Sequence, residues 1–368
     1  MNAAGLLLAD ASPCLRLLVL RELLARPADD EEVLELAPLR NDDPLARDLV
    51  ALQDADGFWR AEEPDSAATA PIMATARALG RLGYLGFDRE HPSIAHGAEW
   101  LFAHQQPDGS WPLPGMDLAP SPPSRNAGRA SRPATAGEGR GERSPAEAEG
   151  YSMIPLQTAL PLRGLAACGY AEDPRAERAY TWVLAQRLPD GAWPTGIASG
   201  TYGRVAGYRR LAHSRWGCRS NTTAALVCLA LHPGRRQSAE ARQGLDLLLG
   251  RETREEHALG FEVARLLGAE RARGFLTYFA LFDPGLALDL CWRIGATIED
   301  ERVSSLASFV RETRGRYGLW QYRARPQVSR WVSFDLLRSL TRLQPSGGWL
   351  SLEPRTPFRA YARQPRRY

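Results

Sequence analysis

The chain has 368 residues, of which 44% are hydrophobic and 24% charged, as in ordinary globular proteins. The formal net charge is only +3, which argues against a nucleic-acid-binding protein. Five widely spaced cysteines predict reduced thiols and a cytoplasmic location. No run of about 18 apolar residues could form a transmembrane helix, and residues 3–9 lack the basic flank of a signal peptide.

Hydrophobic residues recur along the chain with the helical spacing i, i+3, i+4 and i+7. No stretch alternates convincingly with the period of two that a half-buried strand would need. The sequence therefore predicts an all-α protein with helices over residues 14–24, 67–82, 94–105, 156–168, 222–231, 286–294 and 332–343.

Two segments have a different composition. Residues 117–150 contain no aromatic residue and are rich in Pro, Gly, Ser and Arg, which predicts a disordered insertion that interrupts the helical pattern. Residues 353–368 form a basic and aromatic tail, and we expect a solvated terminus there.

A turn that ends in tryptophan repeats along the chain as QDADGFW, QQPDGSW and QRLPDGAW. These copies end at Trp59, Trp111 and Trp193, and partial copies end at Trp320 and Trp349. Without the insertion the period is about 50 residues with two helices per unit, and Gly260-Phe261 stands where a degenerate copy would fall. Units of this size must stack to bury their apolar faces, so we expect one domain over residues 1–368.

The helices on the two sides of each turn differ in composition. Those that follow a turn are rich in Ala, Gly, Ser and Thr, as in NTTAALVCLAL, and those that precede it carry Arg, Glu and Gln, as in RAERAYTWVLAQR. This difference favours a ring with a crowded inner layer of helices and a solvated outer layer.

The turn resembles the QW repeat of terpenoid cyclases and the related repeat of protein prenyltransferase β subunits. The resemblance covers roughly residues 45–350, and its best copies are Gln53/Gly57/Trp59, Gln106/Gly109/Trp111 and Gln186/Gly191/Trp193. It implies an α/α toroid whose inner helices line an apolar cavity suited to an isoprenoid.

The chain departs from the chemistry of both families. The D-x-D-D motif, whose middle aspartate protonates the alkene in squalene-type cyclases, does not occur. The acidic cluster at residues 299–301 is better explained as the start of a helix. Asp289 and Cys291 resemble the first zinc ligands of a prenyltransferase, but no histidine follows them, so we expect neither metal nor cofactor.

Asp289 is the candidate catalytic acid. It stands among large apolar residues on an expected inner helix, next to Trp292, a candidate substrate-binding residue. A carboxylate in such surroundings must face the cavity, an arginine or solvent. A structural ion pair is the alternative explanation.

The segment 200–226 is a second candidate region, because it places aromatic and basic residues just before an inner helix. The first turn of that helix could bind an anion such as a diphosphate, or Ser220 or Asn221 could simply cap it. The candidate substrate-binding residues here are Tyr202, Tyr208, Arg209, Arg215, Trp216, Arg219 and Asn221.

The start of the last inner helix is a third candidate region. Trp331 and Ser333 could line the cavity and bind substrate, whereas the helix dipole alone explains Asp335.

The resemblance leads to a hypothesis of an isoprenoid-binding protein that cyclises or transfers its ligand. A non-catalytic toroid that binds a lipid or a protein partner is the main alternative, and peripheral membrane contact is compatible with it. A carbohydrate-active toroid, which needs two facing carboxylates, is a weaker one.

Overall fold

Helices joined by tight turns make up the part of the chain that the computed structural model describes, namely residues 3–60, 71–111, 154–196, 205, 209–250, 258–271, 278–315 and 317–343. These ranges contain no β-strand, only isolated bridges such as the one between Gln53 and Trp59. The prediction of an all-α fold is therefore confirmed. The predicted insertion 117–150, the tail 353–368 and Trp349 lie outside the described residues.

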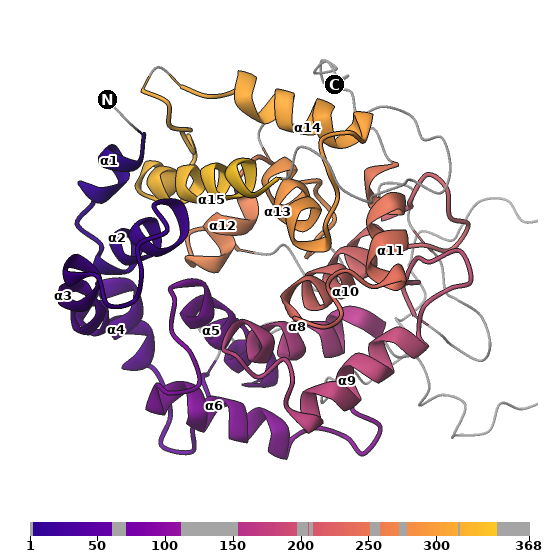
Figure 1. Cartoon of the computed structure of the whole chain (residues 1–368). Helices are drawn as coiled ribbons and strands as arrows, with labels where there is room; N and C mark the ends of the chain where they lie inside the picture. The colour runs from indigo at the N-terminus through magenta and orange to yellow at the C-terminus, as the bar shows by residue number, and fades with distance from the viewer. Residues whose placement is uncertain are drawn as a thin grey trace, which may run out of the picture.

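The inner layer is a ring of helices in chain order (Figure 1). From α5 onward each inner helix packs against the next, and the last one contacts the π-helical turn η1 near the beginning of the chain. The inner elements are α2 (Pro13–Leu18) with η1 (Val19–Leu23), α5 (Pro71–Tyr84), α8 (Ile154–Ala167), α10 (Arg219–Leu231), α13 (Pro284–Ile294) and α15 (Ser329–Arg342).

The outer layer alternates with the inner layer along the chain (Figure 1). Its helices are α6 (Pro92–Ala103), α9 (Pro174–Ala185), α11 (Ala239–Leu249) and α14 (Glu301–Glu312). The N-terminal elements α1 (Ala3–Leu8), α3 (Glu31–Leu39), η2 (Arg40–Asp42) and α4 (Pro44–Val50) lie along the outer edge beside α2. This arrangement of two helical layers is the predicted α/α toroid.

Several helices begin at an aspartate or serine directly followed by proline. Ser12, Asp43, Asp173 and Asp283 each accept a backbone N–H bond from the first turn of the helix that follows. Proline fits the first helical position because its missing N–H would have no partner there. Asp300 caps α14 in the same way, so the acidic cluster at 299–301 does start a helix.

Small residues let the inner helices approach closely. A Cβ atom at Gly83 of α5 would lie 2.7 Å from the backbone of Ala167, and one at Gly164 of α8 would lie 2.5 Å from the carbonyl oxygen of Ala76. Larger side chains would push these two helices apart, which explains the small-residue composition of the inner layer.

Each turn tryptophan connects an outer helix to the inner helix that follows. The indole Nε1–H of Trp59, Trp111, Trp193 and Trp320 donates at 2.7–2.8 Å to the carbonyl oxygen of the residue ten positions earlier. The tryptophan backbone N–H donates to a hydroxyl in the first turns of the next inner helix, from Thr75, Thr158, Thr222 and Ser333 in turn. Buried indole groups need such a partner, so these bonds fix each unit against its neighbour.

The glutamine of the turn also has a defined role. Gln53 donates to the carbonyl oxygens of Gly57 and Ser93, both at 2.8 Å. In the second copy the equivalent residue is Gln105, not the expected Gln106, and it donates to Gly109 at 3.0 Å. In the fourth copy Arg314 takes this position and its Nε–H donates to Gly318 at 2.7 Å.

The expected degenerate copy of the turn at Gly260-Phe261 has another structure. Gly260 has the left-handed backbone of the other turn glycines, with φ of 81°, but Phe261 begins the short helix α12 (Phe261–Leu266). Although α12 lies between α11 and α13 in the chain, it packs against the inner helices α5 and α15. It therefore lies inside the ring instead of continuing the repeat (Figure 1).

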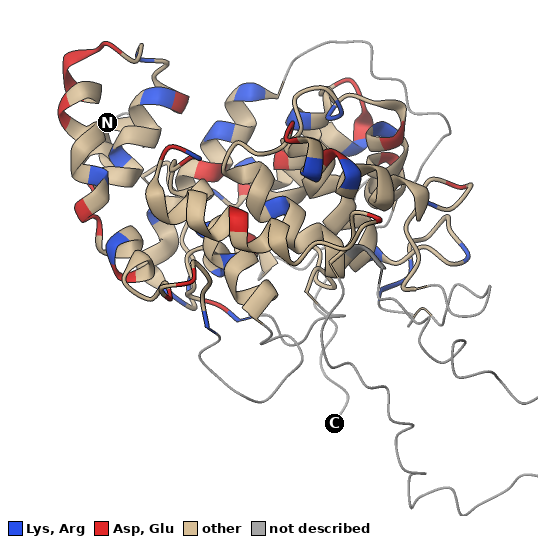
Figure 2. Cartoon of the chain, turned by 90° about the horizontal axis from the view of Figure 1, so that it is seen from below, with Lys and Arg blue, Asp and Glu red and all other residues tan. Residues whose placement is uncertain are grey.

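Acidic and basic residues are interspersed over the described helices (Figure 2). No helix in this part of the chain is long and apolar enough to cross a membrane.

Candidate functional site

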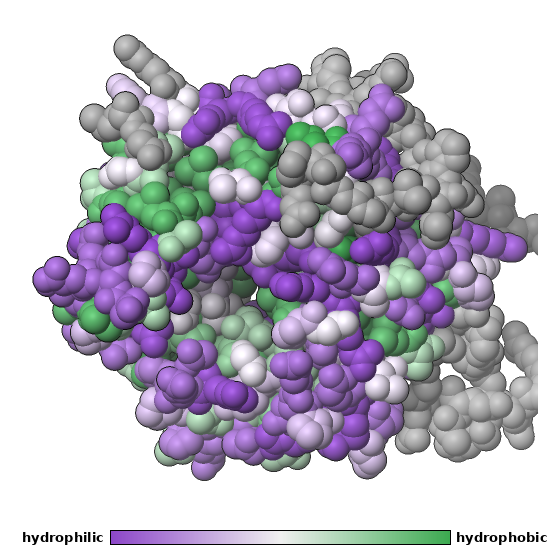
Figure 3. Space-filling model, in the orientation of Figure 1, coloured by the Kyte–Doolittle hydropathy of each residue, from purple (hydrophilic) through white to green (hydrophobic). Residues whose placement is uncertain are grey.

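A cavity of about 250 Å³ lies inside the ring. Figure 3 shows the molecule hollowed near its centre, with mostly hydrophilic residues around the opening. On α5, α8 and α10 the lining residues are in the second half of the helix, such as Gly83, Ala167 and Leu231. On these three helices the cavity therefore lies at the end that is remote from the tryptophan turns.

The cavity has two different walls. The wall formed by α5 and α10 is apolar apart from Tyr84 and includes Gly80, Val227 and Ala230. The opposite wall, from η1, α12, α13 and α15, carries most of the charged side chains, which are Glu22, Glu262, Asp283, Asp289, Arg293, Asp335 and Arg338. An amphipathic cavity of this kind suits a ligand with one apolar and one polar side.

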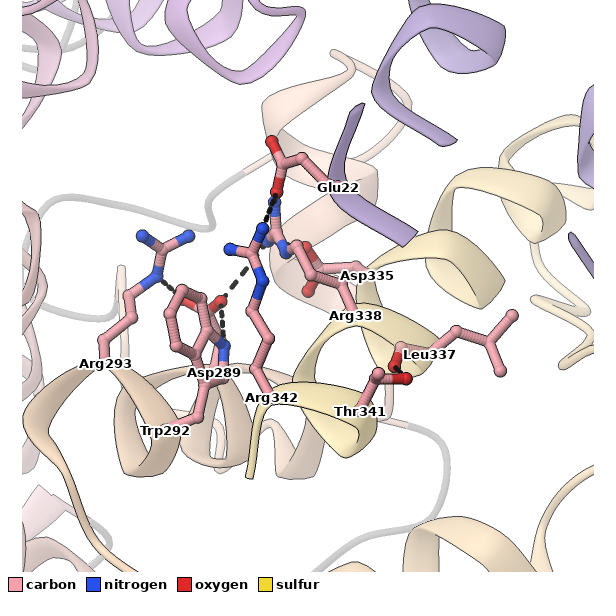
Figure 4. Close-up of polar contacts among 9 residues, drawn as sticks. All are labelled: Glu22, Asp289, Trp292, Arg293, Asp335, Leu337, Arg338, Thr341 and Arg342. Carbon is pink, nitrogen blue, oxygen red and sulfur yellow. Dashed lines mark hydrogen bonds and ion pairs between the residues drawn. The ribbon is translucent and has the colours of Figure 1, made fainter. Parts of the chain in front are cut away.

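Asp289, the expected acid, lies in the charged wall and is bound on several sides (Figure 4). Its carboxylate accepts bonds from Arg293 at 2.7 Å and from Trp292 at 3.1 Å, and it pairs with Arg338 at 3.3 Å. Burial alone would raise the pKa of Asp289, but the two guanidinium charges and these hydrogen bonds lower it below the ordinary value. Asp289 is thus a cavity-lining anion that also takes part in ion pairs.

Asp335 is the second carboxyl group of this wall, one helix away on α15. It is 7% exposed and forms a close ion pair with Arg338, one turn along the same helix. Burial raises the pKa of Asp335 to about 6, and the negative charge of Asp289 acts in the same direction against the attraction of Arg338. Two neighbouring carboxyl groups therefore have opposite tendencies to hold a proton, which is typical of acid–base sites.

The indole ring of Trp292 packs between two guanidinium groups (Figure 4). The central carbons of Arg293 and Arg342 lie 4.5 Å and 4.8 Å from its ring centroid. Cation–π contacts of this kind hold the aromatic ring and the arginines in place. Trp292 is not among the residues that line the cavity, so it supports Asp289 from the side.

Helix α12 adds a second cluster of ion pairs beside the cavity, centred on Glu262. Glu262 pairs with Arg163 of α8 at 2.5 Å and closely with Arg265 on its own helix. Asp283 accepts backbone N–H bonds from Gly260 at 3.0 Å and Glu262 at 2.8 Å, which anchors α12 to the start of α13. Burial raises the pKa of Asp283 to about 6 in spite of these bonds.

The expected binding loop before α10 is only partly described, since Tyr202 and Tyr208 lie outside the described residues. Arg219 donates to the carbonyl oxygen of Ala280 at 3.2 Å, and the Asn221 amide donates to that of Pro194 at 2.8 Å. Both of these side chains are buried, as is Arg209, whereas Arg215 is exposed and its guanidinium lies 5.0 Å from the Trp216 ring. None of the described loop residues lines the cavity.

The two candidates at the start of α15 also lie away from the cavity lining. The Ser333 hydroxyl accepts the backbone N–H of Trp320 at 2.8 Å, so it belongs to the turn described above. The Trp331 ring is buried and packs 5.8 Å from the ring of Tyr84, which does line the cavity. Trp331 therefore supports the wall from behind.

Sequence reasoning passed over Arg163 and Glu262, and explained Asp335 by the helix dipole alone. One signal for Arg163 was present, because this arginine interrupts the apolar stretch TALPLRGLAA of an inner helix. A charged residue is rarely buried unless it is paired. No comparable pattern marks Glu262, whose partner lies about 100 residues away in the chain.

Cys291 is fully buried on α13, and burial raises the pKa of its thiol well above the ordinary range. A thiol in this state is a poor nucleophile and a poor metal ligand. The described residues contain no group of three or more His, Cys, Asp or Glu side chains that could hold a metal ion.

No family model and no curated protein matches the chain. Among solved structures, the type II terpene cyclase MstE from Scytonema, in complex with its substrate geranylgeranyl dihydroxybenzoate, is similar at 14% identity and a TM-score of 0.32, over 81% of this chain and 95% of that one. A protein from Actinoplanes aligns at 13% identity and a TM-score of 0.29, over 81% of this chain and 97% of that one. The toroid assignment rests on the helix contacts of the chain itself.

Proposed function

We propose that the central cavity binds an isoprenoid and that Asp335 protonates one of its double bonds, as in a terpenoid-cyclase type of reaction. The observation that carries this proposal is the pair of carboxyl groups in one cavity wall, one ionised and one held toward its protonated form. The resemblance of the turns to the QW repeat supports the isoprenoid as ligand class.

In this reaction the O–H bond of Asp335 breaks and a C–H bond forms at one alkene carbon. The other carbon becomes cationic, and the carboxyl group becomes a carboxylate. A second double bond of the ligand attacks the cationic carbon and closes the ring, and a proton lost from the resulting cation returns to the Asp335 carboxylate, which gives a neutral product and restores the acid. Arg338, which already pairs with Asp335, stabilises that carboxylate as it forms. Asp289 stays ionised and stabilises the cation, so we assign it a catalytic role as an anion rather than as the acid.

The loop residues 209–221 stay candidates for a separate binding role, because they lie at the start of α10, whereas the cavity is lined by the last residues of that helix. Trp216 and Arg215 are the best suited, because the Trp216 ring is only partly buried and Arg215 is exposed. Arg219 and Asn221 support the loop through their bonds to carbonyl oxygens.

A non-catalytic toroid that binds a lipid is the second candidate function. Two observations favour it: Asp289 is engaged by two arginines, and the cavity of about 250 Å³ is smaller than most ligand pockets, which span roughly 300–1,000 Å³.

The experiment is to incubate the purified protein with geraniol, farnesol, squalene, and farnesyl and geranylgeranyl diphosphates. Products are identified by gas chromatography and mass spectrometry, and binding is measured by calorimetry. We expect a cyclised product from the wild type, and at least a 100-fold loss of rate in Asp335→Asn. Asp48→Asn, which changes an exposed carboxylate, is the matched control and should leave the rate unchanged.

The outcomes separate the candidate functions. Binding without turnover would support the lipid-binding toroid and reject the proton-transfer step. If no compound binds or reacts, both candidates are wrong.

A further inference from the structure

The charged groups of the cavity wall are already paired with one another. Arg293 and Arg338 are bound to Asp289, and Arg338 also to Asp335 and Glu22. Glu262 holds Arg163 and Arg265. The charge of these arginines is therefore already balanced by carboxylates, and a diphosphate would have to displace them to gain several cationic partners, which is expensive because the pairs are buried.

Two buried hydrogen-bond donors among the described residues that line the cavity lack a partner. They are the hydroxyl of Tyr84 on α5 and the Nε–H of Arg338 on α15. Burial raises the pKa of Tyr84 well above its ordinary value, and the carboxylates around it act in the same direction, so the phenol stays neutral. Buried polar groups are nearly always bonded, and an orphan of this kind in a cavity wall points to a ligand or a water.

The size of the cavity limits the ligand that it can take. An engineered protein cavity of about 150 Å³ holds benzene. On that scale the cavity of about 250 Å³ holds roughly ten carbon atoms. The apolar wall of α5 and α10 would contact this carbon chain.

On the basis of the proposed function, we infer that the cavity selects a short isoprenoid whose polar end is an uncharged oxygen, an alcohol or carbonyl of about ten carbons, and that Tyr84 binds this oxygen. The phenol donates its hydrogen bond to the ligand oxygen. The Nε–H of Arg338 is the other donor without a partner among the described residues of the cavity lining.

The test compares four ligands by isothermal calorimetry. They are geraniol, its deoxygenated hydrocarbon 2,6-dimethyl-2,6-octadiene, geranyl diphosphate, and the longer alcohol geranylgeraniol. For the wild type we expect geraniol to bind at least tenfold more tightly than its diphosphate and more tightly than the other two.

Tyr84→Phe removes the hydroxyl and keeps the ring. We expect it to weaken geraniol binding five- to tenfold and to leave hydrocarbon binding unchanged, because only the alcohol can use the hydroxyl. Tyr180→Phe is the matched control: its hydroxyl donates to the carbonyl oxygen of Cys228 at 3.0 Å and it does not line the cavity. This control should lower the melting temperature and leave the affinity for geraniol unchanged.

Each result decides the inference. Tighter binding of the diphosphate, or an equal effect of Tyr84→Phe on alcohol and hydrocarbon, would overturn it while the proposed function stands. If none of the four ligands binds, the inference is overturned, and the incubation with farnesol, squalene and the longer diphosphates still decides the proposed function. If Tyr84→Phe does not fold, the wild-type ranking of alcohol against diphosphate still decides.

Discussion

Glu22 of the first inner element and Arg338 of the last inner helix form an ion pair at 3.4 Å, across the point where the ring closes. Glu22 also pairs with Arg342 at 3.2 Å. The π-helical turn η1 carries Glu22, and turns of this type are frequent at functional sites. The residues that close the ring are therefore the same ones that hold Asp335 and Asp289 in the cavity wall.

Replacing Glu22 should change the proton affinity of Asp335. In Glu22→Gln, Arg338 loses one competing carboxylate and interacts more strongly with Asp335, so the pKa of Asp335 falls. If Asp335 is the acid, wild-type activity decreases about tenfold per pH unit above pH 6, and in Glu22→Gln this decrease begins about half a unit to one unit lower. The measurement is the pH profile of turnover.

The control for this variant is Glu32→Gln, which changes a half-exposed carboxylate paired with Arg16. Its pH profile should match that of the wild type. An unshifted profile in Glu22→Gln would mean that Glu22 only joins the ends of the ring.

The stability of the protein should also depend on pH between 5 and 7. Asp283 and Asp335 have pKa values raised by burial to about 6 in the folded state, above the usual value of about 4 in an unfolded chain. The folded state therefore binds more protons in this range, and the stability that is present below pH 4 is lost as the pH rises through 6. We expect the melting temperature to decrease from pH 5 to pH 7.

In Asp335→Asn this decrease should be smaller, because one of the two groups no longer titrates. A decrease of the same size in Asp335→Asn and in the wild type would contradict the raised pKa of Asp335. Circular dichroism at several pH values and constant ionic strength is sufficient to measure it.

Arg338 should contribute more to stability than its neighbour Arg342. Arg338→Leu leaves Asp335, Asp289 and Glu22 without their shared partner, and breaking a buried pair in this way destabilises a protein by about 3–5 kcal/mol. The side chain of Arg342 is 35% exposed, and among the described residues it forms its ion pair with Glu22, so Arg342→Leu should cost less than about 1 kcal/mol. Urea unfolding of both variants tests the difference, and equal losses would show that the Arg338 cluster has no special weight.

The sequence pattern was sufficient for the fold but not for the site. Helical periodicity and the residues of the repeated turn are patterns of local spacing, and both can be seen in a single stretch of sequence. The pairing of Asp289 with Arg338 joins two inner helices 49 positions apart, and spacing within a helix does not specify which residue of the next helix it faces. The turn itself leaves one ambiguity, because the sequence alone does not show which of the adjacent Gln105 and Gln106 bonds to the turn. In the structure Gln105 donates to the Gly109 carbonyl oxygen.

The turn glycines offer a test of the architecture that does not depend on function. Gly109 and Gly169 have similar left-handed backbones, with φ of 94° and 86°. A Cβ at Gly109 would lie 2.6 Å from the backbone of Arg178 on α9, whereas at Gly169 nothing lies within 4 Å. Gly169→Ala therefore has only the backbone penalty of about 1–2 kcal/mol.

Gly109→Ala has that penalty and also forces α9 away from the turn, which adds about 1–3 kcal/mol. We expect the free energy of unfolding of Gly109→Ala, measured in urea, to be lower than that of Gly169→Ala by about 1–3 kcal/mol. Equal values for the two alanine variants would show that the turn does not pack directly against the next outer helix, and that the tryptophan alone connects neighbouring units.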